Sequence, residues 1–327
     1  MEYDDDSNYS SSSSSVEHLI VMVNGTGGSA KDWMFATEQF VTVFPDKVFV
    51  HRSKQNVGKL AKDGVDIMGE RLAREVVEVI QRQPSMRKIS FIAYSVGGLV
   101  ARYAIGQLYK APENETENEA DSIGTIGGLL AMNFITLATP HLGSSGHLQV
   151  PILFGRTMLE KIASIVAPCI VGKTGRHLFL TDGTQRKDPL LLRMVEDSDE
   201  GYFMSALRAF ERRVVYSNIV NDYIVGWRTS SISGDRAYIK MMTKLNEEYP
   251  HVVYEEDCHT CDQIGSSNIH DEMVRGLSSV AWQKVNVSFN SGRLIQYQAH
   301  SLIQVKYKSK HIKGADVIKH MIDHFLI

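Results

Sequence analysis

The segment 91–103, Phe-Ile-Ala-Tyr-Ser-Val-Gly-Gly-Leu-Val-Ala-Arg-Tyr, constrains the fold of this chain more than any other stretch. An apolar run of strand length meets a helical pattern at one residue, Ser95. So sharp a turn forces Ser95 toward a sparsely populated backbone conformation, which requires small residues two positions away on either side. Gly97 meets this requirement, and Ala93 exceeds it by one methyl group. We therefore predict a buried strand, a tight turn presenting the Ser95 hydroxyl, and a helix.

A hydroxyl held out of a sheet in this way can act as a nucleophile when a base lies within hydrogen-bond reach. The pattern therefore predicts a serine hydrolase. The alternative is a serine in an ordinary turn between a strand and a helix. The apolar strand before Ser95 and the long helical pattern after it favour the nucleophile.

The other predicted strands are uniformly apolar and alternate with helices. Strands are expected at 18–23, 47–51, 89–94, 134–138, 213–219 and 285–289, and helices at 33–40, 63–82, 96–109 and from Ala315 onward. Such strands are typical of a mostly parallel central sheet covered by helices on both faces. The fold class is therefore α/β, with ligand chemistry expected at the carboxyl ends of the strands.

The alternation of apolar strands and helices is interrupted in two places, and these interruptions define the expected organisation of the chain. Residues 1–15 are acidic and serine-rich, and we expect a disordered tail there, followed by one domain over 16–327. Between 143 and 212, apolar residues recur at helical spacing from Met158 to Val166, which predicts a helical cap over the active site. The alternative is packing of this stripe onto the main domain. Residues 227–280 form a second excursion, expected to be helix and loop.

Composition excludes several classes of protein. The 327 residues are 43% hydrophobic and 22% charged, which is typical of a soluble protein with a sizeable core. The net charge of −3 argues against a nucleic-acid partner. No apolar run approaches the ~18 residues needed to cross a bilayer, and the N-terminus lacks the pattern of a secretion signal, so we expect a cytoplasmic location.

The three cysteines predict neither a disulfide framework nor a metal site. An odd count fits a reducing compartment. Cys258 and Cys261 have the spacing of half a zinc site, but no second pair of ligands follows them. A loop with incidental thiols is the expected structure, and no metal or cofactor is predicted.

Activation of Ser95 requires a base and a carboxylate, which follow the serine in the chain order serine, acid, histidine in folds of this kind. Asp222 lies just past an apolar strand, where the acid is expected; the alternative is an Asn-Asp turn that caps local backbone. The base should lie between the last strand and the C-terminal helix, which leaves His300 and His311. We favour His300 because His311 lies in a basic stretch expected to be solvated. His320 and His324 are expected on a helix surface.

Two backbone N–H groups must also stabilise the oxyanion that forms during acyl transfer. Val96 supplies one by its position after the nucleophile, and Thr26 in the glycine-rich loop 24–28 is the candidate for the other. This loop could instead hold phosphate, but it lacks the spacing of the nucleotide-binding glycine motifs.

Taken together, these motifs resemble the lipase-like putative serine esterase family of the α/β-hydrolase superfamily. The matching segments are 21–29 with Asp32 and Trp33, 63–73, the turn at Ser95 with 97–103, 139–143, 172–182, Asn221 and Asp222 with Val225, and Ala299 and His300 with the closing helix. The resemblance implies Ser95 as nucleophile, Asp222 as acid and His300 as base. It also implies hydrolysis of carboxylic esters, with a lipid ester as the expected partner.

The chain departs from the family pattern at two positions. Asn24 stands where the family usually has a histidine, and Ala93 replaces a glycine. Neither change removes a catalytic group, so they bear on rate and substrate preference. A thioesterase or amidase would use the same residues, and a non-catalytic receptor with this fold is the alternative outside enzymes. A transient contact with a membrane surface is also expected, and the oligomeric state is not predicted.

Overall fold

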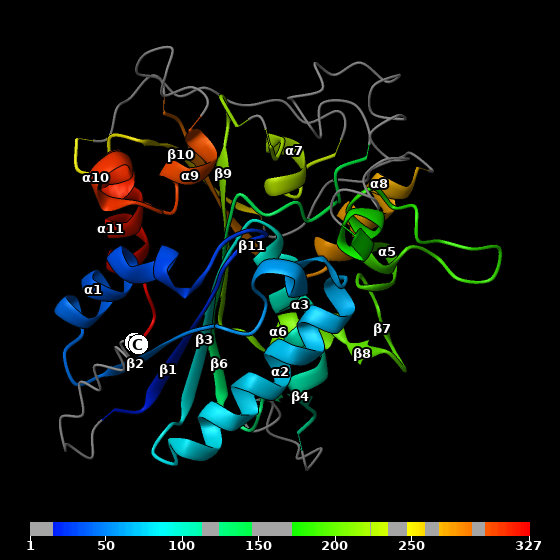
Figure 1. Ribbon diagram of the computed structural model, residues 1–327, viewed down its shortest axis with the longest axis horizontal. Coiled ribbons are helices and arrows are strands. Elements are labelled where there is room, and N and C mark those ends of the chain that lie inside the picture. The colour runs from blue at the N-terminus through cyan, green and yellow to red at the C-terminus, as the bar shows by residue number, and fades with distance from the viewer. Residues whose placement is uncertain are drawn as a thin grey trace.

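A mostly parallel sheet lies at the centre of the molecule (Figure 1). The structure, a computed structural model, describes residues 16–112, 124–145, 172–222, 224–234, 247–258, 268–289 and 298–327. Within them the main sheet has seven strands, in spatial order β10 (Val252–Cys258), β11 (Trp282–Val287), β9 (Arg212–Asn218), β6 (Leu130–Leu137), β3 (Lys88–Tyr94), β1 (His18–Val23) and β2 (Val48–Arg52). Only the β10–β11 pair is antiparallel among these neighbours. The predicted α/β class is therefore confirmed.

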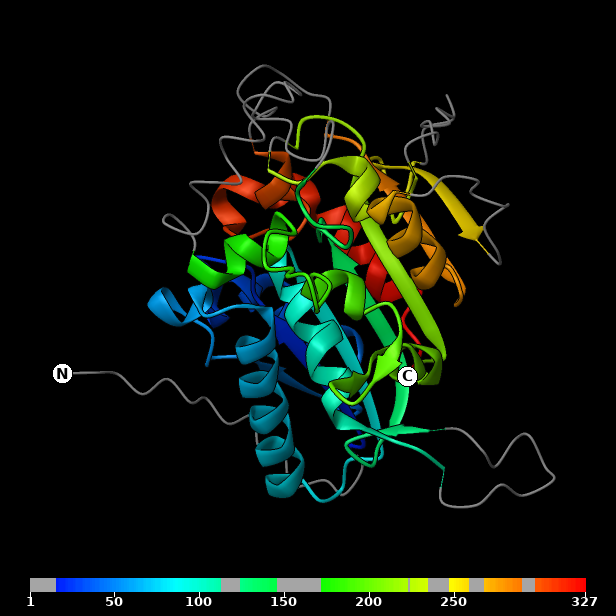
Figure 2. The same ribbon diagram turned by 90° about the vertical axis from the view of Figure 1, so that its right-hand side faces the viewer.

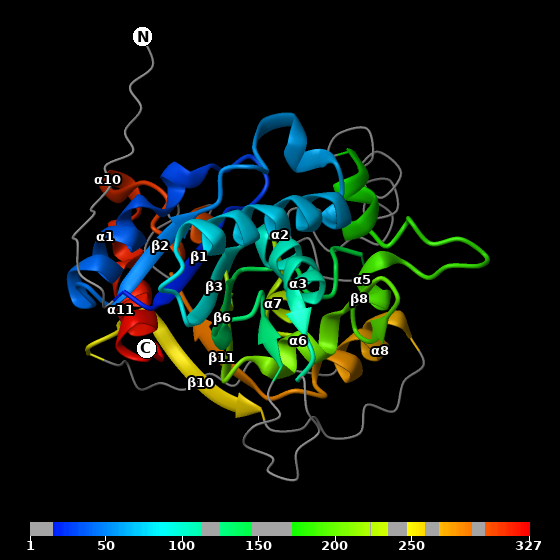
Figure 3. The same ribbon diagram turned by 90° about the horizontal axis from the view of Figure 1, so that it is seen from below.

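Alternate residues of the strands enter two separate hydrophobic cores, one on each face of the sheet. In β1, Leu19 and Val21 belong to one core, and Ile20 and Met22 to the other. The first core is covered by α2 (Val65–Arg82), α3 (Val96–Leu108), α6 (Phe203–Ala209) and α8 (Ile269–Leu277), and the second by α1 (Met34–Val43), α9 (Ala299–Leu302) and α11 (Ala315–Asp323). Figure 2 shows α2 and α3 in front of the sheet, and Figure 3 shows the sheet between the two groups of helices.

Shorter elements complete the described fold. They are the pairs β4 (Tyr109–Lys110) with β5 (Thr125–Ile126) and β7 (Asp197–Ser198) with β8 (Gly201–Tyr202), the helices α5 (Leu190–Arg193), α7 (Trp227–Ser230) and α10 (Lys308–His311), and the 3-10 turns η1 (Ala30–Trp33), η2 (Gly58–Lys62) and η5 (Ile312–Gly314).

The last parallel strand begins three residues earlier than its apolar pattern predicts. Gln283 and Lys284 interrupt the apolar run at the start of β11. Lys284 is nevertheless buried, because its ammonium group donates a hydrogen bond to the backbone carbonyl of Ile232 at 3.1 Å. Burying a charged group without a partner is costly, so a lysine is not expected at a buried strand position. Here a hydrogen-bond acceptor from another segment makes that burial possible.

The prediction of helix and loop alone over 227–280 is wrong, because this region also contains β10. This strand lies at the sheet edge, paired with β11 on one side only. Glu255, Glu256 and Asp257 on it are exposed, as expected for an edge strand that carries charge. Because these residues are charged, the uniformly apolar pattern that predicts the buried strands does not predict this one.

Two histidines expected on the surface are buried. His320 is fully buried and bonds the Tyr216 hydroxyl at 2.9 Å and the Glu255 carboxylate at 3.0 Å. His311 is also buried, and its Nδ1 accepts a hydrogen bond from the backbone N–H of Tyr307 at 3.1 Å. Only His324 of these three is exposed. The surface prediction for His311 and His320 was wrong because these specific partners replace water.

Several predictions fall on residues outside the described ranges. They concern the tail 1–15, the helical stripe Met158–Val166 and the loop residues 259–261, whereas Cys258, expected in the same loop, is the last residue of β10. Within 143–212, the described α6 packs onto α3, where the rings of Tyr103 and Phe203 lie 5.3 Å apart. The cap therefore stays a prediction for the part of the insertion that precedes residue 172.

A buried histidine, His18, links the start of the sheet to the C-terminal segment, because its ring stacks on that of Phe325 with the ring centroids 5.5 Å apart. The hydroxyl oxygen of Ser90 accepts hydrogen bonds from the backbone and side-chain nitrogens of Asn133, at 3.0 and 2.9 Å. Its own proton is therefore donated to His18 Nε2, 2.8 Å away, which requires neutral His18. Burial and the nearby Lys88 lower the pKa of His18 from 6.5 to about 4.

We expect His18 to make folding stability depend on pH. Its folded-state pKa lies below the unfolded value, so the unfolded chain binds the extra proton, and stability falls as pH drops from 6.5 toward 4. Between pH 7.5 and 5.0 this amounts to about 2 kcal/mol. His18→Gln keeps an acceptor for Ser90 without titrating, so urea unfolding should show a pH-induced loss that is smaller by this amount. Exposed His324→Gln is the control, and equal pH slopes for wild type and His18→Gln would contradict the prediction.

Candidate active site

Ser95 occupies the turn between β3 and α3 in a strained backbone conformation. Its φ of 54° lies in the left-handed region that non-glycine residues rarely adopt. Such a conformation costs on the order of 1–3 kcal/mol and persists only when the surrounding packing enforces it. Two hydrogen bonds hold the turn: the Ser95 N–H donates to Leu137 O and the Thr139 hydroxyl donates to Ser95 O, both at 2.9 Å.

The small residues near Ser95 are required by close contacts with the backbone. A Cβ on Gly97 would lie 2.6 Å from the carbonyl oxygen of Asn24, and a Cβ on Gly25 would lie 2.8 Å from the Cβ of Ser95. Either would force the glycine-rich loop away from the start of α3. Ala93, the departure from the family pattern, is fully buried in the first core, so its methyl group fills space there.

Three side chains from distant parts of the chain form a continuous hydrogen-bonded relay. Ser95 Oγ lies 3.1 Å from His300 Nε2, and His300 Nδ1 lies 2.9 Å from Asp222 Oδ2. Because an ionised carboxylate only accepts, Nδ1 carries the proton and Nε2 is free to accept the serine proton. Ser95 and His300 are each 7% exposed.

Asp222 is buried but well supplied with hydrogen-bond donors. Its Oδ1 accepts from the backbone N–H groups of Ile224 and Val225, at 3.0 and 2.9 Å, and its Oδ2 also accepts from the Asn218 amide at 2.9 Å. Burial by itself would raise the pKa of Asp222, but the charge and hydrogen bond of His300, with Val225 and Asn218, lower it. The carboxylate therefore stays ionised beside His300 at neutral pH.

Tyr94 and Asn218 support this relay, and the sequence contained no signal for either role. The Tyr94 ring lies 4.9 Å from the His300 ring. Tyr94, the last residue of β3, thus contacts the imidazole of the relay directly. Asn218 lies at the end of β9 and donates to both Asp222 and the backbone carbonyl of Ala299, so it ties the acid to the helix that carries His300.

The two predicted oxyanion donors lie around one cavity. Thr26 and Val96 line it together with Asn24 and Gly25 from the same loop. The loop turns tightly, because the N–H of Gly28 donates to Gly25 O at 3.0 Å, which leaves the Thr26 N–H outside this bond. Val96 is the first residue of α3, where backbone N–H groups have no partner within the helix.

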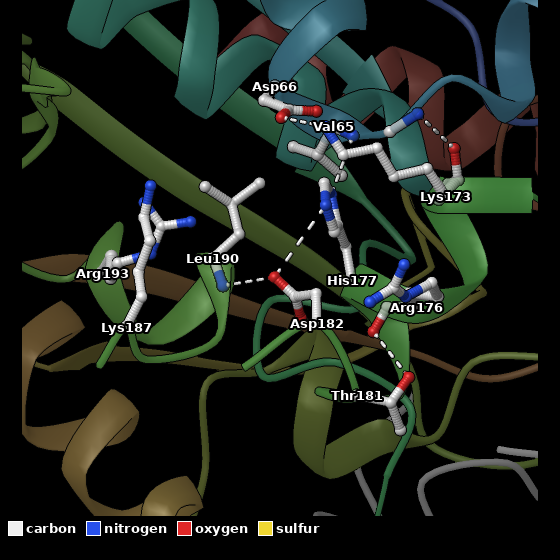
Figure 4. A network of polar contacts seen from close by, with 12 residues as sticks. Val65, Asp66, Lys173, Arg176, His177, Thr181, Asp182, Lys187, Leu190 and Arg193 are labelled. Atoms are coloured by element: carbon white, nitrogen blue, oxygen red, sulfur yellow. Dashed lines mark hydrogen bonds and ion pairs between the residues drawn. The ribbon is translucent and has the colours of Figure 1, made fainter. Parts of the chain in front are cut away.

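The motif 172–182, for which the sequence offered no role, caps the helix that lines the same cavity. Met68 of α2 and Ala61 of η2 are cavity residues. The N–H of Gly64 donates to the Thr174 hydroxyl at 3.1 Å. The N–H of Val65 donates to His177 Nδ1, also at 3.1 Å (Figure 4). These contacts satisfy N–H groups at the start of α2, where Gly64 has no side chain to do so.

Asp182 extends this contact to the next helix. Its Oδ2 accepts a hydrogen bond from the Leu190 N–H at 2.8 Å and lies 3.9 Å from His177 Nε2 (Figure 4). Leu190 is the first residue of α5. The described end of the insertion is therefore fixed to the main domain through the polar groups of this motif.

The parallel sheet, with Ser95 after β3, Asp222 after β9 and His300 after β11, defines an α/β hydrolase. The described residues contain no group of three or more side chains that could hold a metal ion. Within the same ranges, no helix is long and apolar enough to cross a bilayer. Residues 13–233 match the family described as "Putative serine esterase (DUF676)", and the chain belongs to this family.

Curated relatives and solved structures are also similar to the chain. It is 30% identical over 231 residues to "Putative lipase ROG1" of Saccharomyces cerevisiae, which covers 66% of this chain and 28% of that protein. It is 29% identical to "Putative lipase C4A8.10" of Schizosaccharomyces pombe, over 68% of this chain and 27% of that protein. The chain thus spans less than a third of these relatives. The mature Bacillus licheniformis lipase BlEst2 matches with 17% identity and a TM-score of 0.38, covering 63% of this chain and 67% of that one.

Proposed function

We propose that this chain hydrolyses carboxylic esters, with lipid acyl esters as the substrate class, through an acyl-enzyme on Ser95. The relay from Ser95 through His300 to Asp222, with its contacts of 3.1 and 2.9 Å, is the observation that carries the proposal. Membership of a serine esterase family and similarity to two yeast proteins described as putative lipases support the ester and lipid assignments.

The reaction has two steps that use the same groups. Ser95 Oγ attacks the acyl carbon while His300 Nε2 takes its proton, and the imidazolium then protonates the departing alcohol. Water attacks the acyl-enzyme next, with His300 again as base, which releases the acid and restores Ser95. Asp222 holds the imidazole in the tautomer that accepts at Nε2 and stabilises its charge. The N–H groups of Val96 and Thr26 are the donors to the oxyanion.

Covalent labelling of Ser95 tests the proposal directly. A fluorophosphonate probe should modify the purified chain, and mass spectrometry of the digest should locate the adduct on Ser95. Labelling should be lost in His300→Ala, because the serine then has no base. His311→Ala is the matched control, since its ring bonds only the Tyr307 N–H among described contacts. An adduct on another serine, or unchanged labelling of His300→Ala, would refute the assignment.

A panel of p-nitrophenyl esters of increasing chain length, with matched thioesters and amides, identifies the preferred bond. We expect the esters to be turned over fastest. Faster turnover of a thioester or an amide would show that the same residues catalyse thioester or amide hydrolysis instead. Stoichiometric labelling without turnover of any substrate would instead favour a ligand receptor that retains the fold.

A further inference from the structure

A surface of lysines and large apolar side chains lies beside the candidate active site. We call it the basic patch; it consists of Lys31, Met34, Tyr307, Lys310, Ile312 and Lys313. Two further lysines connect the N-terminal part of the patch (Lys31 and Met34) to its C-terminal part (Tyr307 to Lys313). Lys308 Nζ lies 3.3 Å from the Glu38 carboxylate of α1, and Lys306 Nζ lies 3.1 Å from that of Asp32 in η1. Segments 270 residues apart in the chain thus form one surface.

The charge of this surface is opposite to that of the whole chain. Together, the patch and its joining contacts contain five lysines and two carboxylates, whereas the chain has a net charge of −3. Within the described residues, Lys310 and Lys313 form no ion pair, so both remain available to an external anion. A positive surface on a net negative chain favours contact with an anionic partner at this face.

Apolar groups lie among these lysines, which distinguishes the patch from an ordinary solvated surface. Met34 is 50% exposed, Tyr307 53% and Ile312 49%. A soluble anion or a nucleic-acid backbone would leave such aliphatic side chains without a partner. A bilayer satisfies both kinds of group, because lysines meet lipid phosphates while tyrosine and aliphatic side chains enter the interfacial region.

The patch adjoins both halves of the active site. The Asp32 carboxylate, which forms the ion pair with Lys306, also accepts a hydrogen bond from the backbone N–H of Ser29. Ser29 lies at the end of the loop that carries Thr26. On the other side, Lys306 follows His300 by six residues. Figure 1 shows α9, α10 and α1 on the same side of the molecule. A surface bound here therefore lies next to the groups proposed to act on the ester.

We propose that the basic patch docks this chain onto an anionic phospholipid bilayer. Its lysines bind lipid phosphates, Tyr307 lies at the level of the headgroups, and Met34 and Ile312 enter the outer edge of the acyl region. This deepens the proposed function by naming the bilayer as the source of the ester substrate, and in that respect it rests on that function. Docking itself requires no catalysis.

Co-sedimentation with vesicles tests the docking apart from the chemistry. In a Ser95→Ala background, the chain should bind vesicles of phosphatidylcholine with phosphatidylserine more tightly than vesicles of phosphatidylcholine alone. The double variant Lys310→Glu/Lys313→Glu should weaken binding by at least about 10-fold, and Ile312→Ser by about 5-fold. The control, Lys47→Glu/Lys110→Glu, makes the same charge change on exposed lysines at the amino-terminal edge of the sheet and should change binding by less than about twofold.

Each outcome decides the question. Equal losses of binding in the two double variants would show that only the net charge of the chain matters, and would overturn the proposal that the basic patch is the docking site. So would equal binding to both vesicle types, or no binding to either. With Ser95 intact, the patch variants should retain hydrolysis of a soluble ester and lose hydrolysis of an ester embedded in vesicles. Absence of all esterase activity would refute the proposed function while leaving the vesicle-binding result to stand.

Discussion

Replacing Ser95 by alanine should lower kcat for ester hydrolysis by about 10⁴- to 10⁶-fold. Without Oγ there is no acyl-enzyme, so water must attack the ester with only His300 and the oxyanion donors to assist it. Binding of substrate does not depend on the hydroxyl, so KM should change little, and the loss should appear in kcat. Initial rates with a p-nitrophenyl ester under saturating conditions measure the effect.

Ser217→Ala provides the matched control for this experiment. Ser217 lies on β9 and is 1% exposed, and its hydroxyl has no hydrogen-bond partner in the described part of the chain. The same chemical change in β9, which β6 separates from the strand before Ser95, should leave kcat within about twofold and stability unchanged or slightly raised. Retention of more than about a tenth of the wild-type kcat by a folded Ser95→Ala chain would be incompatible with a serine nucleophile.

Asp222→Asn should lower kcat by about 10³- to 10⁴-fold, which corresponds to about 4–5 kcal/mol of lost transition-state stabilisation. The asparagine oxygen can still accept from the N–H groups of Ile224 and Val225. Its amide nitrogen then faces His300 Nδ1, so the ring must accept there and carry its proton on Nε2. That tautomer cannot take the proton of Ser95, although the three side chains keep their positions.

Asp323→Asn is the control, because it makes the same change on α11, away from the site. Asp323 accepts hydrogen bonds from Tyr249 and Lys319 near the surface, and its loss should leave kcat unchanged. Thermal unfolding of both variants separates lost chemistry from lost folding. A properly folded Asp222→Asn chain with a rate near wild type would remove Asp222 from the relay and direct attention to another carboxylate.

The local part of the fold was predictable from residue patterns. β1 and the helices after Gly64 and Gly314 begin where apolar periodicity and small residues place them. These signals are local, because a buried parallel strand must be apolar on both faces and an amphipathic helix must repeat every 3.6 residues. The turn at Ser95 belongs to the same class, because its strain demands small neighbours that can be read from a few adjacent positions.

Features that depend on a distant partner could not be read in this way. β10 can carry charge because it lies at an edge, and Lys284 can be buried because a backbone carbonyl from another segment accepts a hydrogen bond from its ammonium group. The burial of His320 depends on Tyr216, more than a hundred residues earlier in the chain. The roles of Tyr94 and Asn218 likewise exist only because α9 packs against the ends of β3 and β9.

By itself, the sequence determined the α/β class, the strained turn at Ser95 and the short set of residues able to act with it. Each of these follows from local sterics or from the period of the apolar pattern. The tertiary structure decided which imidazole reaches Ser95 Oγ, which donors keep Asp222 ionised and which lysines meet on one surface. Those outcomes depend on the distances between segments that are remote in the chain. Hydrogen bonds and ion pairs act over a few ångströms in space, whatever the sequence separation of their partners.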